Sequence, residues 1–183
     1  MAASGRAGSL SLLRDFRLLV YLFVAFRLTM LIVYQPMLID GVERGVSAGG
    51  DLTYYQALGA FGDQGFLPFR DYWSEFPPIW PLVYTTVYQL TKSGAESNYS
   101  SFASVIGLIM LAFDTGNLIL LRRIGERLHG RDVGLALAWI YAVLLAPAVF
   151  LWWTFETMVG FTLLLTVWWL TTPREGREIS RST

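Results

Sequence analysis

Four long apolar stretches alternate with polar segments along the chain. They run over residues 18–36, 102–121 and 133–152, with a somewhat shorter fourth stretch over 158–171. About 20 consecutive apolar residues are enough for a helix to cross the hydrocarbon core of a bilayer. The pattern therefore predicts an all-α integral membrane protein with about four transmembrane helices.

The segment between the first two stretches, residues 37–101, has a different pattern. Apolar side chains recur in it at helical spacing, which predicts a short amphipathic helix lying in the membrane interface. They are Leu52, Tyr55, Leu58 and Phe61.

A second short helix is expected after the Pro77-Pro78 pair, because a helix can begin at a proline. Residues 78–92 would make a helix of roughly 22 Å, whereas spanning a bilayer core takes roughly 30 Å. We therefore expect this aromatic-rich helix to be interfacial or re-entrant.

Arginines that flank the apolar stretches set the expected orientation, because short arginine-rich loops stay on the cytoplasmic side. We expect the basic segment 122–131 to be a loop. It lies on the same side of the membrane as the N-terminus only if helix 78–92 does not span the membrane. We therefore expect a multi-pass protein of the cell membrane. Its expected parts are a cytoplasmic N-terminus (1–17), a transmembrane module (18–171) with an external loop (37–101), and a polar cytoplasmic tail (172–183).

Composition narrows the classes of function. Hydrophobic residues make up 54% of the chain and charged residues 15%, against about 25% charged in soluble domains. The formal net charge is zero, which argues against a nucleic-acid partner. There is no cysteine and a single histidine, His129, so thiolate and histidine metal sites are excluded and no metal or cofactor is expected.

One motif region carries a family resemblance. Residues 65–72 read Gly-Phe-Leu-Pro-Phe-Arg-Asp-Tyr, and residues 75–78 read Glu-Phe-Pro-Pro. In this order, after a first span and an acidic residue, they resemble the N-terminal part of GT-C fold glycosyltransferases that use polyprenyl-phosphate sugar donors, especially bacterial mannosyltransferase-like members.

The resemblance implies a partial GT-C module and an enzyme that transfers a hexose such as mannose, with inversion at the anomeric carbon. It implies Asp51 as the catalytic base, by motif position. A base at this place would take the proton of the acceptor hydroxyl. The substrate contacts implied for the donor phosphate and the sugars are Arg70, Asp71, Glu75 and Glu156.

Each of these residues also has a simpler interpretation. Asp51 could cap the helix that follows it, since Asp is favoured at that position. Asp71, Glu75 and Glu156 could be solvated loop or turn carboxylates, and Glu156 stands where the family often has Asp. Trp73 and Trp80 are placed for stacking on a sugar.

Two charged residues, Arg27 and Asp114, lie within the apolar stretches. A charge is costly inside a bilayer, so such residues are candidates for a functional role. Counted from the cytoplasmic ends, they lie at similar depths, roughly 14 Å and 11 Å at 1.5 Å per residue. We therefore expect a salt bridge between the first two spans.

The main alternative function is a non-catalytic membrane subunit or scaffold that keeps the N-terminal module. Family members have a longer membrane region than four spans, so we expect the N-terminal part of a complete enzyme, with a second membrane chain as a possible partner beside the lipids and the sugar donor. A small transporter is the weaker choice, because transporters carry their ionisable residues near the midplane.

Overall fold

The computed structural model describes residues 12–33, 37–39, 42–44, 49–94, 96–144 and 155–172, and these are mostly helical, which supports the all-α class. In chain order the helices are α2 (Phe16–Val33), α3 (Gly49–Ala60), the 3-10 helix η1 (Phe61–Gln64), α4 (Ile79–Thr91), α5 (Tyr99–His129), α6 (Arg131–Leu144) and α7 (Glu156–Thr171). Two antiparallel hairpins, which the sequence did not predict, pair β1 (Met37–Ile39) with β2 (Val42–Arg44) and β3 (Lys92–Ser93) with β4 (Glu96–Ser97).

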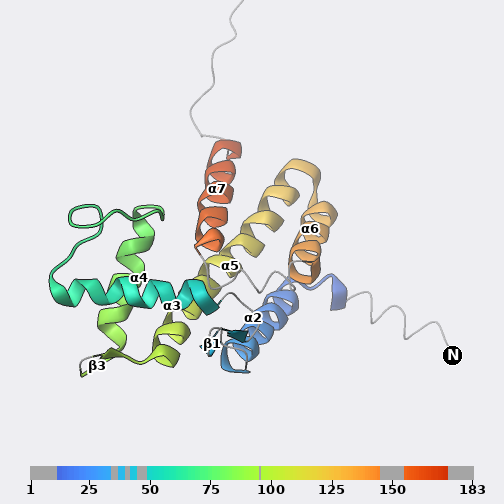
Figure 1. The fold of residues 1–183 in the computed structure, drawn as a ribbon. Coiled ribbons are helices and arrows are strands. Elements are labelled where there is room, and N and C mark those ends of the chain that lie inside the picture. The colour runs from blue at the N-terminus through green and yellow to red at the C-terminus, as the bar shows by residue number, and fades with distance from the viewer. Residues whose placement is uncertain are drawn as a thin grey trace, which may run out of the picture.

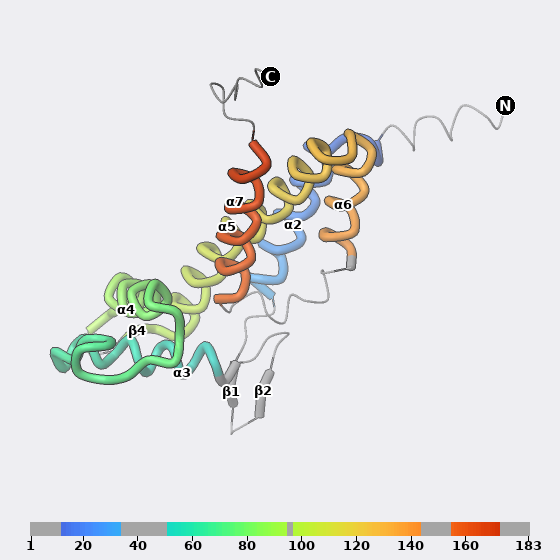
Figure 2. Tube along the Cα trace, turned by 90° about the horizontal axis from the view of Figure 1, so that it is seen from above, coloured from blue at the N-terminus to red at the C-terminus, as the bar shows by residue number. Residues whose placement is uncertain are grey.

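The helices form two groups that share α5. Figure 1 shows α3 crossing α4 on one side of the molecule, while α2, α6 and α7 lie on the other side. The view from above in Figure 2 shows the same division, with the long helix α5 running from the α3–α4 group into the second group. The two short helices expected in residues 37–101 therefore pack as a unit on the first half of α5.

Two of the described helices, α2 and α5, are long and apolar enough to cross a membrane, and α7 is a shorter apolar helix. Helix α2 begins at Phe16, two residues before the predicted stretch, because the Asp15 carboxylate accepts hydrogen bonds from the backbone N–H groups of Arg17 and Leu18 and so caps the helix. Helix α7 likewise begins at Glu156, two residues earlier than predicted.

The predicted salt bridge between the first two apolar stretches is confirmed. Arg27 on α2 and Asp114 on α5 form a buried ion pair with an Nε to Oδ2 distance of 2.9 Å. The Tyr141 hydroxyl on α6 donates a hydrogen bond to the other carboxylate oxygen, and the Arg27 guanidinium lies over the Phe23 ring. Three helices are thus joined by one polar cluster inside an apolar interior.

The prediction that the basic segment 122–131 forms a loop is wrong. Helix α5 continues through it to His129 and ends at Gly130, whose φ of 94° is the left-handed value that favours glycine. Arginine, glutamate and leucine are good helix formers, so a charged run is no reason for a helix to stop. Within the run, Arg122 and Glu126 form an i,i+4 ion pair at 3.2 Å.

Helices α5 and α6 pack back to back at two glycines. A Cβ added to Gly134 would lie 2.5 Å from the carbonyl oxygen of Arg122 and 2.6 Å from the backbone nitrogen of Glu126. A Cβ added to Gly125 would lie 2.6 Å from Leu137. The missing side chains therefore let two helix backbones approach closely, as small residues do in membrane helix pairs.

The largest core holds α3, α4 and the first half of α5 together. The predicted apolar face of α3 is buried at Leu52, Tyr55 and Leu58, while Phe61 lies beyond the helix end and is exposed. From α4 and α5 the buried side chains are Trp80, Tyr84, Val87, Tyr88, Phe102, Ala103, Ile106, Met110 and Leu111, and Leu31 of α2 and Met158 of α7 join the same core.

Candidate functional site

Helix α3 places the predicted base on the same face as a buried tyrosine. Asp51 and Tyr55 are four residues apart, so their side chains lie one above the other on the helix. Asp51 is exposed, whereas Tyr55 is only 2% exposed. The helix begins at Gly49, so Asp51 lies in its first turn and is not its N-cap. A carboxylate in that turn is favoured by the helix dipole.

The Tyr55 ring is the centre of an aromatic cluster drawn from three parts of the chain. Its centroid lies 5.0 Å from that of Phe76 and 5.1 Å from that of Trp80, both in edge-to-face geometry. The Phe155 ring, just before α7, lies 5.9 Å from Phe76 and 6.3 Å from Trp80. Edge-to-face pairs at such distances are favourable contacts, so these rings fix the segments that carry them.

Each of these segments brings a carboxylate. Asp51 lies one helical turn before Tyr55, Glu75 directly precedes Phe76, and Glu156 directly follows Phe155. We call Asp51, Glu75 and Glu156 the carboxylate cluster. The pKa of Tyr55 is raised, first by burial of its hydroxyl and then by the negative charges of these three residues. The packed rings therefore bring together the segments that carry three of the five predicted site residues.

The other two predicted residues, Arg70 and Asp71, form a pair of their own. The Arg70 guanidinium contacts the Asp71 carboxylate at 2.6 Å and donates to the carbonyl oxygen of Gly65. The same carboxylate accepts from the backbone N–H of Leu67. The arginine and this N–H lower the pKa of Asp71. The pair thus holds the turn after Gly65, and Arg70 remains 63% exposed.

The turn has one unusual backbone conformation. Phe69 has a φ of 64°, and its backbone N–H donates to the carbonyl oxygen of Tyr72 at 2.8 Å. A bulky residue at positive φ is a genuine outlier. The surrounding hydrogen bonds hold it there.

Trp73 and Trp80, the two tryptophans placed for stacking on a sugar, differ in exposure. Trp80 is fully buried and its ring belongs to the core, so it is not open to a sugar. Trp73 is 84% exposed and touches the Phe69 ring edge-on at 6.0 Å. The sequence alone does not distinguish a tryptophan that faces solvent from one that is buried in the core, because the indole is amphipathic.

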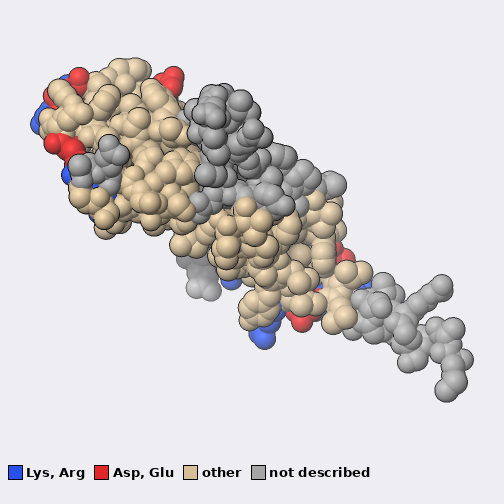
Figure 3. All heavy atoms as spheres, turned by 60° about the horizontal axis from the view of Figure 1, so that its bottom comes forward, with Lys and Arg blue, Asp and Glu red and all other residues tan. Residues whose placement is uncertain are grey.

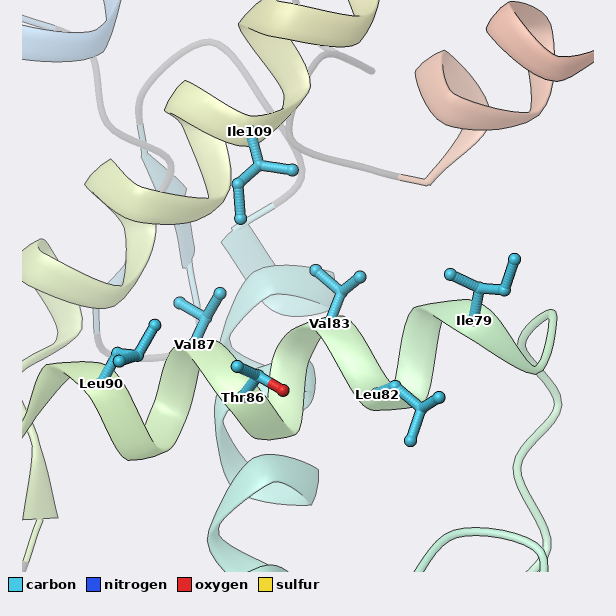
Figure 4. Close-up of a pocket in the computed structure, with 7 residues that line it drawn as sticks. All are labelled: Ile79, Leu82, Val83, Thr86, Val87, Leu90 and Ile109. Atoms are coloured by element: carbon cyan, nitrogen blue, oxygen red, sulfur yellow. The ribbon is translucent and has the colours of Figure 1, made fainter.

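An apolar groove runs along α4 beside this region. Figure 4 shows its lining side chains, which come from α4 and from one residue of α5. The groove has a volume of about 270 Å³ and begins four positions after Glu75. Its lining residues are Ile79, Leu82, Val83, Thr86, Val87, Leu90 and Ile109.

Within the part of the chain that the structure describes, no group of three or more acidic or histidine side chains is close enough to hold a metal ion. Comparison of the chain with protein family models, with curated proteins and with solved structures gives no match in any of the three. What the chain does must therefore be argued from its own residues.

The sequence did not single out Tyr55, Phe76 or Phe155 as site residues. A signal was present for Tyr55, because a tyrosine four positions after a candidate base on a helix must share its face. No local signal could place Phe155 in the same aromatic cluster, since Tyr55 and Phe155 are 100 positions apart in the chain.

Proposed function

We propose that the chain is a multi-pass membrane protein that transfers a hexose, with mannose as the first candidate, from a polyprenyl-phosphate carrier to an acceptor on the external face. The observation that carries this proposal is the carboxylate cluster. The three segments that carry its acidic residues, namely α3, the Glu-Phe-Pro-Pro segment and the start of α7, meet at the packed rings of Tyr55, Phe76 and Phe155. The family resemblance assigns these three residues to the site on separate grounds.

Exposed apolar side chains support the membrane location. Soluble proteins rarely expose large continuous apolar patches, and here such side chains occur along each helix of the second group. In the proposal, α2, α5, α6 and α7 cross the bilayer. These side chains include Tyr21, Leu22, Ile32, Val33, Leu128, Ile140, Val143, Leu163, Trp169 and Leu170.

The charges support an orientation. On the face shown in Figure 3, most of the coloured charged atoms lie toward the two ends of the described surface, and much of the described surface between them is tan. One end of the second helix group carries arginines from α5 and from the segment before α2, whereas the carboxylate cluster lies at the start of α7. By the positive-inside rule the arginine end is cytoplasmic and the carboxylates are external.

In the proposed reaction Asp51 is the base. The acceptor hydroxyl oxygen attacks the anomeric carbon, its proton passes to the Asp51 carboxylate, and the bond from that carbon to the phosphate oxygen breaks. The phosphate leaves with the bonding electron pair as an anion, so no general acid is needed. Glu75 and Glu156 bind the sugars, because their carboxylate oxygens accept hydrogen bonds from sugar hydroxyls.

Arg70 and Asp71 have supporting parts in the proposal. Arg70 is exposed, and its guanidinium contacts Asp71 and the carbonyl oxygen of Gly65 within the same turn. Its exposed N–H groups can donate to the donor phosphate, and arginine often binds phosphates through two parallel hydrogen bonds. Asp71 keeps the arginine in place and contacts a hydroxyl group of the donor sugar. The apolar groove of α4 offers a surface for the hydrocarbon tail of the carrier.

The test is sugar transfer in membranes that contain the chain, with labelled polyprenyl-phosphate mannose and, separately, glucose. The variant is Asp51→Asn, which keeps the shape of the side chain and removes its charge. The matched control is Asp132→Asn, an exposed carboxylate in the first turn of α6. We expect transfer to fall at least 100-fold in the first variant, the lower range for loss of a general base, and to stay unchanged in the second.

Other outcomes decide between the alternatives. Transfer that survives Asp51→Asn would refute Asp51 as the base and move the search to Glu75 and Asp71. Absence of transfer by the wild-type chain, when its membrane level and folding are normal, would favour the non-catalytic membrane subunit. Its partner chain could then be sought by cross-linking from the exposed face of α7.

A further inference from the structure

Six arginines meet at one end of the second helix group. They come from the segment just before α2, from its first turn, from the last turns of α5 and from the start of α6. We call them the arginine rim: Arg14, Arg17, Arg122, Arg123, Arg127 and Arg131.

Contacts between the helices show that these positions share one end. The Arg122 guanidinium lies over the Phe16 ring at 4.4 Å, which joins the end of α5 to the start of α2. The Trp139 indole N–H donates to the carbonyl oxygen of Leu13 at 2.8 Å, which joins α6 to the same place. Arg127 donates to the Thr172 hydroxyl at 2.7 Å, which adds the end of α7.

The rim is strongly positive. Against its six arginines stand three carboxylates at this end, which leaves an excess of three positive charges (6 − 3) among the described side chains. Two of the carboxylates already have local tasks, since Asp15 caps α2 and Glu126 pairs with Arg122. The excess charge is therefore available to an external anion.

Arg123 and Arg127 are the best placed of the six. They lie four residues apart on one face of α5, and both are exposed. The Arg127 guanidinium stacks over the Trp168 ring at 4.8 Å while one of its nitrogens donates to Thr172. A stacked guanidinium keeps its edge donors for bidentate contact with a phosphate, and its fixed position lowers the entropy lost on binding.

The surroundings of the rim indicate which anion. Exposed aliphatic side chains stand among the arginines, namely Leu12, Leu13, Leu128, Val133 and Leu170. Cationic heads beside apolar side chains match the boundary between lipid headgroups and acyl chains. A nucleic acid or an acidic protein would leave these aliphatic side chains without an apolar partner.

We propose that the arginine rim binds the phosphates of anionic phospholipids, with Arg123 and Arg127 as its central pair. The inference rests on the membrane location proposed above and is independent of sugar transfer. The bound lipid would hold the ends of α5, α6 and α7 at the cytoplasmic headgroup layer.

The test uses the full chain purified in a neutral detergent, with labelled phosphatidylglycerol and labelled phosphatidylcholine competing for it. The variant is Arg123→Gln with Arg127→Gln. The matched control, Arg44→Gln with Lys92→Gln, removes the same charge from the hairpin strands β2 and β3, away from the rim. An arginine near an anionic surface adds a factor of about five to affinity, so the rim variant should lose about 25-fold in its preference for phosphatidylglycerol while the control keeps it.

A third variant, Arg127→Lys, keeps the charge and removes the stacked planar group. We expect it to lose part of the preference, which a purely electrostatic attraction would not produce. Thermal unfolding of every variant in phosphatidylcholine alone checks that the fold is intact, and only variants with an unchanged midpoint are compared.

Several results would overturn the inference. A wild-type chain with no lipid preference, or an equal loss in the rim variant and the control, would show that no specific surface exists. Displacement of the lipid by inorganic phosphate at constant ionic strength would identify a site for free phosphate. A chain that an alkaline wash extracts from membranes would contradict the membrane location as well, whereas an embedded chain without preference overturns only the lipid site.

Discussion

Arg27 and Asp114 meet between α2 and α5 with 2.9 Å between Nε and Oδ2, and both side chains are almost fully excluded from solvent. Each charge is tolerated there because the other neutralises it. The Tyr141 hydroxyl satisfies the second carboxylate oxygen. Along α5 the pair lies between Asn98, which caps the start of the helix, and the arginines of its last turns.

Removing one partner of this pair should be far more damaging than removing both. Arg27→Ala or Asp114→Ala leaves a buried charge without its partner and should lower the free energy of unfolding by about 3–5 kcal/mol. The double change Arg27→Met with Asp114→Leu should recover most of that loss. Denaturant unfolding in detergent micelles measures all three, and Glu126→Gln, which breaks the i,i+4 pair on α5, is the control with an expected loss of about 0.5 kcal/mol. Equal losses for the single and double variants would contradict the ion-pair account.

Glycine at position 134 is required by the packing of α5 against α6. Gly134→Ala places a Cβ within 2.5 Å of the Arg122 carbonyl oxygen, so the helices must separate. We expect a loss of about 1–3 kcal/mol in the free energy of unfolding. Gly160→Ala on α7 is the control, since its Cβ would meet Asn117 at an ordinary 3.5 Å. That variant should be neutral or gain up to about 1 kcal/mol, because alanine is the better helix former.

The two tryptophans near the Pro-Pro pair should respond in opposite ways to substitution. Trp80→Ala empties a fully buried site and should destabilise the chain by about 3–5 kcal/mol. Trp73→Ala removes a side chain that is 84% exposed, and its effect on stability should stay within about 0.5 kcal/mol. If Trp73 stacks on the acceptor sugar, its loss should raise the acceptor KM and leave kcat unchanged. Thermal unfolding and acrylamide quenching of the indole fluorescence measure the first contrast.

Alkaline pH should weaken the α3–α4 group through Tyr55. The pKa of this hydroxyl is raised in the folded chain, so the unfolded chain, with a tyrosine pKa near 10.0, releases the proton first. The stability contribution is therefore complete below pH 10 and is lost as the pH rises toward the folded pKa, by about 1.4 kcal/mol per pH unit. Tyr55→Phe should remove this part of the decline. Tyr54→Phe, an exposed neighbour, is the control. An unchanged pH slope in the Tyr55 variant would show that the hydroxyl is not desolvated.

The positions of the helices could be predicted because the information is local. The spacing of Leu52, Tyr55 and Leu58 identified the buried face of α3, and chain length along two apolar stretches matched Arg27 with Asp114. The end of α5 could not be predicted in this way. Its last turns are charged yet intrinsically helical, and only the glycine at 130 stops them.

Less of the candidate site could be predicted from the sequence, because its residues come from distant segments that only tertiary packing brings together. The resemblance named Asp51, Glu75 and Glu156 one by one, but only the folded chain brings their segments together, because Phe76 packs against Tyr55 and Phe155 packs against Phe76. Arg70 was expected to serve a phosphate, yet its own neighbour Asp71 is its present partner. A pairing between adjacent residues depends on the turn they occupy, and the positive φ at position 69 gives no signal in sequence.

The glycine contacts between α5 and α6 also predict an order of assembly. Gly125 and Gly134 are nine positions apart, so the helical hairpin around Gly130 closes a very short loop, which takes tens of nanoseconds. Arg27 must find Asp114 across 87 positions, a much slower search. The hairpin should therefore form first and act as the template on which α2 docks. Substitutions at Gly134 would then slow folding, whereas substitutions at Arg27 would mainly accelerate unfolding.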